Sequence, residues 1–195
     1  MPPMTLTAKQ QTRAAHRARR RAIAAERDLR ADGVALAGHL EPLIARLGIG
    51  PGDVVTAYEH LPHEPHTDAV CRLLAVRGAR VIVPITLPSF DLDWFALDDP
   101  DRTPLGLDAV ARCRLLLIPA LSVDALGNRL GQAGGCYDRT LPRATDNAVV
   151  VALLHPGELD ERPLPTDPWD RPVDLVLTAN GLSAVGPDRR RRLGD

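Results

Sequence analysis

Hydrophobic positions recur with a helical period in the first quarter of the chain. Residues 8–30 are dominated by Ala and Arg and contain neither Gly nor Pro, which predicts a helix. Residues 34–47 place Leu and Ile near a 3.6-residue period and predict a second helix. Pro42 is expected to bend or shorten this helix, and Gly48 is expected to end it.

From residue 53 onward, short apolar runs predict strands that alternate with helical stretches. The predicted strands are 53–58, 79–84 (closed by Pro84), 114–119, 147–154 and 173–178. A helix is expected over 66–77, with an inner face made by Val70, Leu73, Leu74 and Val76. Strands that are almost continuously apolar are typical of a parallel sheet covered on both faces. The pattern therefore predicts an α/β fold: a Rossmann-like, three-layer α/β/α arrangement with a mostly parallel sheet and a basic N-terminal helix.

The composition favours one domain. We expect a disordered N-terminus over 1–8, a single domain over 9–185 and a disordered basic tail over 186–195. No apolar run reaches the length of about 18 residues that a membrane span needs, so no membrane partner is expected. The chain starts basic where a signal peptide needs an apolar stretch, and its three cysteines show no CxxC spacing. Both features favour a cytoplasmic location.

The formal net charge of -1 conceals a strongly basic start. All but one of the 24 basic residues are arginines, and the single lysine is Lys9. A basic stripe can bind nucleic acid, but here no aromatic residue interleaves with the arginines and the net charge is near zero. We therefore expect no nucleic-acid partner and favour a solvated face for these arginines: Arg17, Arg19, Arg20, Arg21, Arg27 and Arg30.

The loop GNRLGQAGGCYDR, residues 127–139, carries the most informative chemistry. It follows a buried strand and is expected to lead into a short helix near 137–141. Small residues let backbone N–H groups approach an anion, Arg129 supplies a fork of donors for phosphate oxygens, and Asp138 can reach Mg²⁺. The alternative is a tight structural turn with a surface arginine. The loop is neither a Walker loop nor a GxGxxG fingerprint.

Two other features have both a functional and a structural interpretation. His60, His63 and His66 have a spacing that invites a zinc site, but the intervening prolines impose an extended chain, so we favour ordinary loop histidines. Cys136 is interpreted as a space-filling replacement for an aromatic residue rather than a reactive thiol.

The segment PALSVDALGNRLGQAGGCYDRTL resembles the signature of the 5-formyltetrahydrofolate cyclo-ligase family. Lys9 and Arg13 resemble the family's N-terminal Lys-x-x-x-Arg, and Glu64 with Thr67 resembles its Glu-x-x-Thr after the first strand. Asp170 resembles the aspartate that precedes its last strand. The resemblance covers residues 9–185.

This resemblance implies an enzyme that closes 5-formyltetrahydrofolate to 5,10-methenyltetrahydrofolate while ATP becomes ADP and phosphate. It implies Mg²⁺ at Asp138 and Asp170, and catalytic roles for Lys9 and Arg129. The implied folate contacts are Glu64, Tyr58 and Trp94, although Trp94 also fits an ordinary core or sheet-edge position. A monomer is expected. The implied ATP contacts are Lys9, Arg13, Arg129, Leu130, Gly131, Gln132, Ala133, Gly134, Gly135, Cys136 and Tyr137.

Three loop positions depart from the family pattern. Gln132 replaces an aromatic or basic residue, Ala133 replaces a glycine, and Cys136 replaces the first of two aromatic residues. A paralogue that binds nucleotide or folate but has lost or changed the reaction is therefore the first alternative function. A nucleic-acid binder that uses the basic helix is the second.

Overall fold

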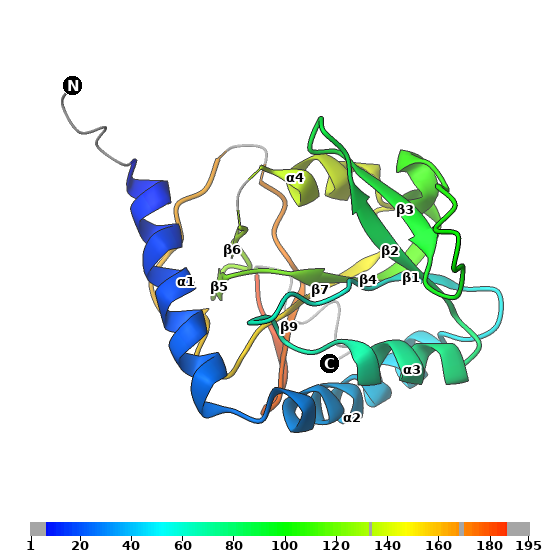
Figure 1. Cartoon of the computed structure of the whole chain (residues 1–195), viewed down its shortest axis with the longest axis horizontal. Helices are drawn as coiled ribbons and strands as arrows, with labels where there is room; N and C mark the ends of the chain where they lie inside the picture. Colours follow the sequence, from blue (N-terminus) through cyan, green and yellow to red (C-terminus); the bar gives the residue numbers. More distant parts are fainter. Residues whose placement is uncertain (1–6, 133, 168–169, 187–195) are drawn as a thin grey trace.

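The computed structural model describes residues 7–132, 134–167 and 170–186 and shows an α/β fold with helices on both faces of a central sheet (Figure 1). The large sheet has the strand order β10-β9-β7-β4-β1-β2-β3, in which the five strands from β9 to β2 are parallel and both edge strands are antiparallel. The mostly parallel three-layer prediction is confirmed. The strands of this sheet are β1 Val54–Thr56, β2 Arg80–Thr86, β3 Leu92–Ala96, β4 Cys113–Pro119, β7 Val149–Leu153, β9 Leu175–Thr178 and β10 Gly181–Ala184.

A second, three-stranded sheet has the order β6-β5-β8 and consists of β5 Ser122–Asp124, β6 Arg129–Leu130 and β8 Leu159–Asp160. The helices are α1 Ala8–Glu26, α2 Leu29–Leu47, α3 Asp68–Val76 and α4 Cys136–Thr140, with 3₁₀ turns η1 Leu107–Arg112 and η2 Leu141–Arg143. Among the described residues, no helix combines the length and the apolar composition that a membrane crossing requires.

The first predicted helix, over 8–30, is too long, because the helix is interrupted at Arg27 and Asp28. Arg27 is extended, and the Asp28 carboxylate caps α2 by accepting from the backbone N–H groups of Arg30 and Ala31 at 3.1 and 3.0 Å. Pro42 does not shorten α2, which continues to Leu47 and ends at Gly48 in the left-handed conformation, as predicted. Packing of the apolar face of α2 against the sheet outweighs the missing N–H of Pro42.

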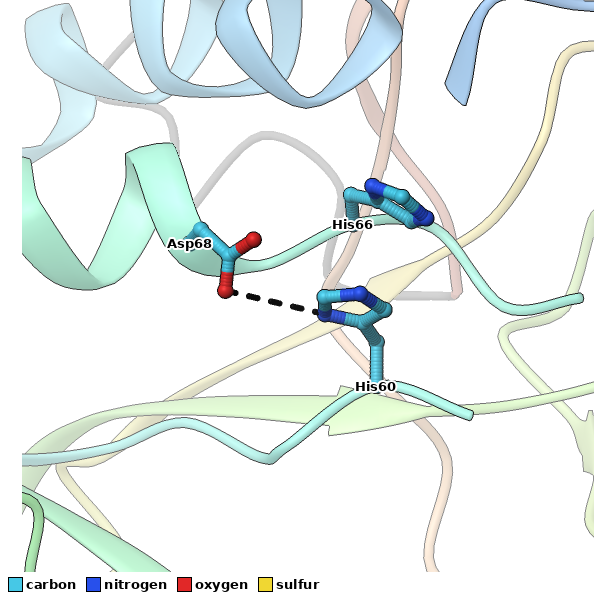
Figure 2. Close-up of side chains that lie close together, drawn as sticks. All are labelled: His60, His66 and Asp68. Atoms are coloured by element: carbon cyan, nitrogen blue, oxygen red, sulfur yellow. Dashed lines mark ion pairs between the residues drawn. The ribbon is translucent and has the colours of Figure 1, made fainter. Parts of the chain in front are cut away.

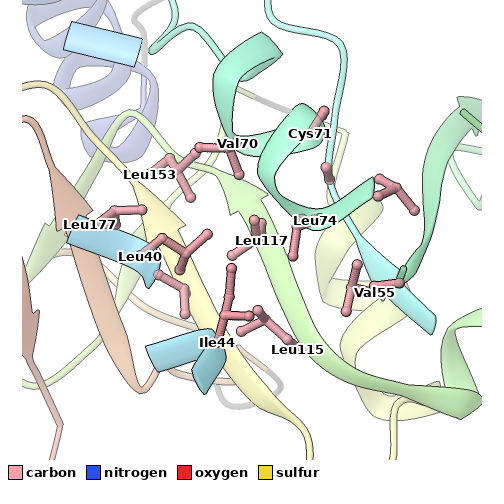
Figure 3. Packing of buried hydrophobic residues seen from close by; sticks show 14 of the residues in the cluster. Leu40, Ile44, Val55, Val70, Cys71, Leu74, Leu115, Leu117, Leu153 and Leu177 are labelled. Atoms are coloured by element: carbon pink, nitrogen blue, oxygen red, sulfur yellow. The ribbon is translucent and has the colours of Figure 1, made fainter. Parts of the chain in front are cut away.

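Helices α2 and α3 pack on one face of the large sheet (Figure 1; Figure 3). Val70 and Leu74 of α3 are buried there, but Val76 is 85% exposed, so its predicted place on the inner face is wrong. Val76 follows Leu74 by two residues, which turns it about 200° around the helix axis. The other face of the sheet packs against a separate cluster that includes residues of α4 and η1.

Strand β2 does not end at Pro84 as predicted but runs on to Thr86. Its neighbour β1 ends at Thr56, which pairs with Ile82. Pro84 therefore has no strand beside it on that side, and its missing N–H leaves no hydrogen bond unmade there. On its other side β2 pairs with β3, which the sequence analysis missed.

Helix α1 lies beside the small sheet rather than on a face of the large one (Figure 1). Arg20 is 3% exposed and forms a two-pronged ion pair with buried Glu158 at 2.7 and 2.6 Å. It also donates to the backbone carbonyl of Ala120, at the end of β4, at 2.5 Å. The predicted solvated position of Arg20 is therefore wrong, because Arg20 anchors α1 to the body of the protein.

The remaining arginines of the basic stripe divide into two groups. Arg17 donates to Gln132, and Arg27 pairs with Asp32 at 2.5 and 2.8 Å, so neither is simply solvated. Arg19, Arg21 and Arg30 are exposed, as expected. The sequence-based expectation that residues 9–185 form one domain stays a prediction, and the expected disordered ends at 1–8 and 186–195 fall mostly outside the described residues.

Candidate functional site

A pocket of about 280 Å³ opens at the carboxyl edge of the large sheet. The chain proceeds from β1 to β2 on one side of β1, whereas β4 lies on the other side. The crevice at such a reversal of strand order is the usual ligand site of open α/β sheets. The pocket is lined by Lys9, Arg13, Tyr58, Glu59, Leu61, Glu64, Pro84, Thr86, Leu92, Pro119, Arg129, Gly131, Gln132, Gly135, Cys136, Tyr137, Asp138 and Asp170.

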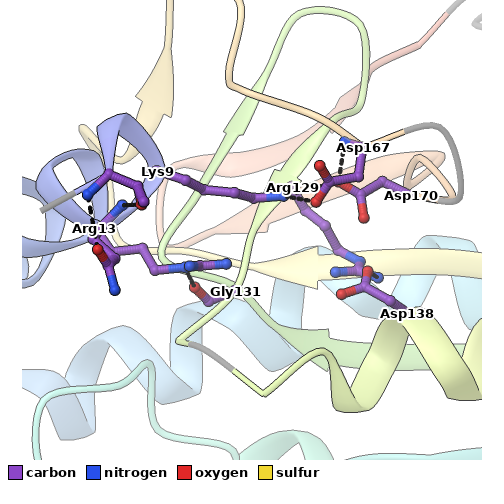
Figure 4. Close-up of polar contacts among 9 residues, drawn as sticks. Lys9, Arg13, Arg129, Gly131, Asp138, Asp167 and Asp170 are labelled. Carbon is purple, nitrogen blue, oxygen red and sulfur yellow. Dashed lines mark hydrogen bonds and ion pairs between the residues drawn. The ribbon is translucent and has the colours of Figure 1, made fainter.

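Lys9, in the first turn of α1, reaches across the pocket to two carboxylates (Figure 4). Its Nζ donates to Asp167 at 2.6 Å and to Asp170 at 3.3 Å. Burial opposes the charged ammonium, but the two carboxylates outweigh burial and raise the pKa of Lys9. The only lysine of the chain is thus held, charged, in the pocket wall.

Arg129 and Asp138 form a second ion pair in the same wall (Figure 4). The Arg129 side chain extends from β6 and is 5% exposed, whereas Asp138 lies in α4 and is 26% exposed. Within the described part of the chain, three buried polar atoms of pocket residues have no hydrogen-bond partner: Nε of Arg129 and the hydroxyls of Tyr58 and Tyr137. Such atoms are rare in folded proteins and mark a place where a ligand can satisfy them.

The loop between β6 and α4 is held from two sides. Arg13 donates its Nε–H to the carbonyl of Gly131 at 3.2 Å (Figure 4). Arg17 donates to the side-chain oxygen of Gln132 at 3.1 Å. Gly134 has φ +85°, and a Cβ there would lie 2.8 Å from the Phe90 ring of the β2–β3 turn. The loop therefore requires glycine at this position. Ala133 lies outside the described residues.

Tyr58 and Glu64 line the side of the pocket formed by the chain after β1. Glu64 is 4% exposed, and one of its carboxylate oxygens accepts from the backbone N–H of Leu61 at 3.1 Å. Burial raises the pKa of Tyr58 and of Tyr137 well above the usual tyrosine value, so both hydroxyls keep their protons and can donate. Pro84, Leu92 and Pro119 make the apolar part of the wall.

Among the described residues, three that the sequence assigned to ligands do not line the pocket. Trp94 is fully buried in the core cluster on the α4 side of the sheet, with Ile118 and other apolar residues, so the ordinary core position is correct and a folate contact is not supported. Leu130 is fully buried against Leu121 and Leu164. Gly134 shapes the loop but does not line the pocket.

Asp167, which makes the shortest contact with Lys9, was not predicted from the sequence. The signal was present, because Asp167 lies three residues before Asp170 in the same segment and donates its backbone N–H to the Asp170 carboxylate at 2.9 Å. The contribution of Leu92 to the apolar wall was not predicted either, because no strand was predicted at the position of β3.

Comparisons with known proteins agree on one family. The model of the 5-formyltetrahydrofolate cyclo-ligase family matches residues 5–179. The chain is 33% identical over 145 residues to the 5-formyltetrahydrofolate cyclo-ligase of Mycolicibacterium smegmatis, which covers 65% of this chain and 74% of that protein. It is 37% identical over 83 residues to the Escherichia coli K12 protein of the same name, a match that covers 42% of each chain.

Two solved structures share the fold. The 5,10-methenyltetrahydrofolate synthetase of Aquifex aeolicus has a TM-score of 0.71, with 93% of this chain and 94% of that chain covered. The synthetase of Mycoplasma pneumoniae has a TM-score of 0.68, with 89% and 99% covered. Both are 19% identical to this chain, so they support the arrangement of the elements and not the roles of single residues.

Proposed function

The chain belongs to the 5-formyltetrahydrofolate cyclo-ligase family, and we propose that it closes 5-formyltetrahydrofolate to 5,10-methenyltetrahydrofolate with ATP and Mg²⁺, releasing ADP and phosphate. The observation that carries the proposal is the convergence of Lys9, Arg129, Asp138 and Asp170 on one pocket that Glu64 also lines. Phosphate-binding cations, magnesium-binding carboxylates and an acid suited to the donor nitrogens of a pterin thus come together.

The reaction needs an activated formyl oxygen, because a formamide is a poor electrophile and its oxygen a poor leaving group. The formyl oxygen attacks the γ-phosphorus of ATP, and the bond from that phosphorus to the bridging oxygen breaks to release ADP. The N10 nitrogen then attacks the formyl carbon and loses its proton, and the C–O bond breaks to release phosphate. Each step depends mainly on positioning and on charge neutralisation.

Lys9 and Arg129 are the cations that we assign to the transferred phosphate. In the free protein both are paired with carboxylates, Lys9 with Asp167 and Asp170 and Arg129 with Asp138. Carboxylate oxygens are the ligands that Mg²⁺ prefers, so the donor set at Asp138 and Asp170 fits this ion, which would neutralise phosphate charge. We infer that the two cations exchange carboxylate oxygens for phosphate oxygens when the nucleotide binds.

The remaining contacts follow from the pocket wall. We assign to ATP the part of the pocket wall formed by Arg13, the backbone of Gly131, Gln132 and Gly135, and the residues Cys136 and Tyr137. Tyr58 and Glu64 are the folate side. We also propose that the protein is a monomer. The three free thiols of the chain support a reducing cytoplasm as its location.

Saturating Mg-ATP is expected to stabilise the fold, because the ligand binds only the native state. At 100 times the Kd the gain is about 2.7 kcal/mol, which raises the Tm of a protein of this size by roughly 5–10 °C. Differential scanning fluorimetry with and without millimolar Mg-ATP measures it. An unchanged Tm with Mg-ATP and with Mg-ADP would show that the protein does not bind the nucleotide.

Two variants test the magnesium assignment in the same experiment. Asp138→Asn and Asp170→Asn keep the side-chain shape but remove a negative charge, so each should raise the Mg²⁺ concentration needed for half of the nucleotide-dependent shift. Asp108→Asn is the matched control, because Asp108 is an exposed carboxylate that also pairs with an arginine, Arg143, but lies away from this pocket. Equal Mg²⁺ requirements in all three variants would show that the assignment is wrong.

A further inference from the structure

A second hollow, of about 460 Å³, opens beside the segment that joins β1 to α3. It shares Tyr58 and Glu59 with the main pocket, and its wall also contains His60, Asp68 and Cys71. The function proposed above uses none of these last three side chains. The hollow therefore holds potential metal ligands that have no assigned role.

His60 and Asp68 line this hollow, and His66 lies close to both of them (Figure 2). The two imidazole rings are stacked with their centroids 4.0 Å apart and their planes at 26°. One ligand atom from each of the three side chains lies within 4.8 Å of the other two, and Nδ1 of His60 is 3.9 Å from the nearer Asp68 oxygen. The sequence favoured ordinary loop histidines, whereas the structure brings two of the three, His60 and His66, together with Asp68.

The segment 58–67 folds back on itself because Thr67, at its end, forms hydrogen bonds with Tyr58 and His60, at its start. The Thr67 hydroxyl donates to the carbonyl of Tyr58 at 2.6 Å, and its backbone N–H donates to Nδ1 of His60 at 3.4 Å. This closure brings positions 60 and 66 face to face and starts α3 at Asp68. His63 is exposed, and its backbone carbonyl accepts from His155 at 3.1 Å, so it takes no part in the cluster.

We propose that His60, His66 and Asp68 bind a zinc-class transition-metal ion, a site separate from the magnesium site of the main pocket. Two imidazoles and one carboxylate are a donor set that suits Zn²⁺, and Asp68 is exposed, so water can supply the fourth ligand. The site draws on no residue assigned to ATP or folate, so it stands independently of the proposed reaction.

Protonation in the cluster is compatible with this role. Metal ligation needs neutral imidazole, and partial burial together with the neighbouring His60 lowers the pKa of His66. Cys71 is not counted as a ligand, because its sulfur does not belong to the group of ligand atoms that lie within 4.8 Å of one another. The ring lone pairs lie in the ring planes and zinc–nitrogen bonds are about 2.0–2.1 Å long, so the rings rotate out of the stack when the ion binds.

Metal at this position would join the two ends of the segment 58–67. That segment also carries Tyr58 and Glu64 into the main pocket. A bound ion would therefore hold the folate side of the main pocket in one arrangement, which gives the metal a structural role rather than a place in the chemistry.

The test is a Zn²⁺ titration of the full, tag-free chain by isothermal titration calorimetry, repeated with Co²⁺, whose d–d absorption reports the ligands. We expect one ion per chain with wild-type protein. His60→Gln and His66→Gln should each weaken binding by more than about tenfold, because even residues that only support a ligand contribute about 10–100-fold. His63→Gln, in the same segment, should bind like the wild type.

Two controls separate loss of a metal ligand from loss of the fold. Metal-free variants must melt like the metal-free wild type, and Asp68→Asn provides a third ligand substitution on an exposed side chain if a histidine variant does not fold. Absence of stoichiometric Zn²⁺ binding, or equal binding by His63→Gln and by the ligand variants, would overturn the proposal. Loss of nucleotide binding in the main pocket would leave this result unaffected.

Discussion

Replacing Lys9 with alanine is expected to lower kcat/KM by about 10²–10³-fold, the usual effect of removing one preorganised group that stabilises developing charge. Lys9 is held in the pocket wall by Asp167 and Asp170 and cannot be replaced by another lysine, since the chain has no other. Steady-state kinetics with ATP and 5-formyltetrahydrofolate measure the effect. The fold should be unaffected, because Lys9 stands in the first turn of α1, far along the helix from Arg20.

The control for Lys9 is Arg21→Ala on the same helix. Arg21 is exposed, whereas Arg17 and Arg27 each contact another side chain and would not be neutral substitutions. Lys9→Arg keeps the charge but changes its geometry, and should recover only part of the activity. Small and equal losses for Lys9→Ala and Arg21→Ala would show that Lys9 takes no part in the reaction.

Replacing Arg20 with methionine is expected to destabilise the protein by about 3–5 kcal/mol, since it leaves the carboxylate of Glu158 buried without a partner. For a chain of this size the loss lowers the Tm by roughly 6–20 °C. Arg20 and Glu158 are 3% and 1% exposed, so solvent does not screen the pair. Chemical denaturation and thermal melting both measure the loss.

The partner variant separates an unpaired charge from a general packing defect. Arg20→Met with Glu158→Gln removes both charges but keeps an acceptor for the backbone N–H of His155, which donates to Glu158 at 2.8 Å. This double variant should recover most of the lost stability. Arg143→Ala, which breaks the exposed pair with Asp108, should cost no more than about 1 kcal/mol. Equal losses for Arg20→Met and Arg143→Ala would contradict the anchoring role of Arg20.

The parallel core of the sheet could be predicted because its strands are continuous apolar runs. β4 and β7 are almost completely buried, so nearly every position is apolar and the pattern is unambiguous. The edge and small-sheet strands could not be found this way. β6 and β8 have two residues each, too few for a period, and Asp93 interrupts the apolar pattern of β3.

Site residues could be predicted where the residue type itself indicates the chemistry. They could not be predicted where their role depends only on how the chain folds. Lys9, Arg129, Asp138 and Asp170 are charged residues in recognisable motifs, and all line the pocket. Burial cannot be deduced from identity alone, which explains the error at Arg20 and why two positions remained open for Trp94. Arg20 differs from its exposed neighbours Arg19 and Arg21 only by facing Glu158, a residue 138 positions away.

The account is tested most directly by turnover of the wild-type chain, followed through the absorbance of the methenyl product with ADP measured in parallel. The account predicts that 5-formyltetrahydrofolate is converted only when both ATP and Mg²⁺ are present, with one ADP formed for each methenyl group. Protein that gains thermal stability from Mg-ATP but forms no methenyl product would contradict the account. It would instead identify a nucleotide-binding relative in which the departures at Gln132, Ala133 and Cys136 have ended catalysis.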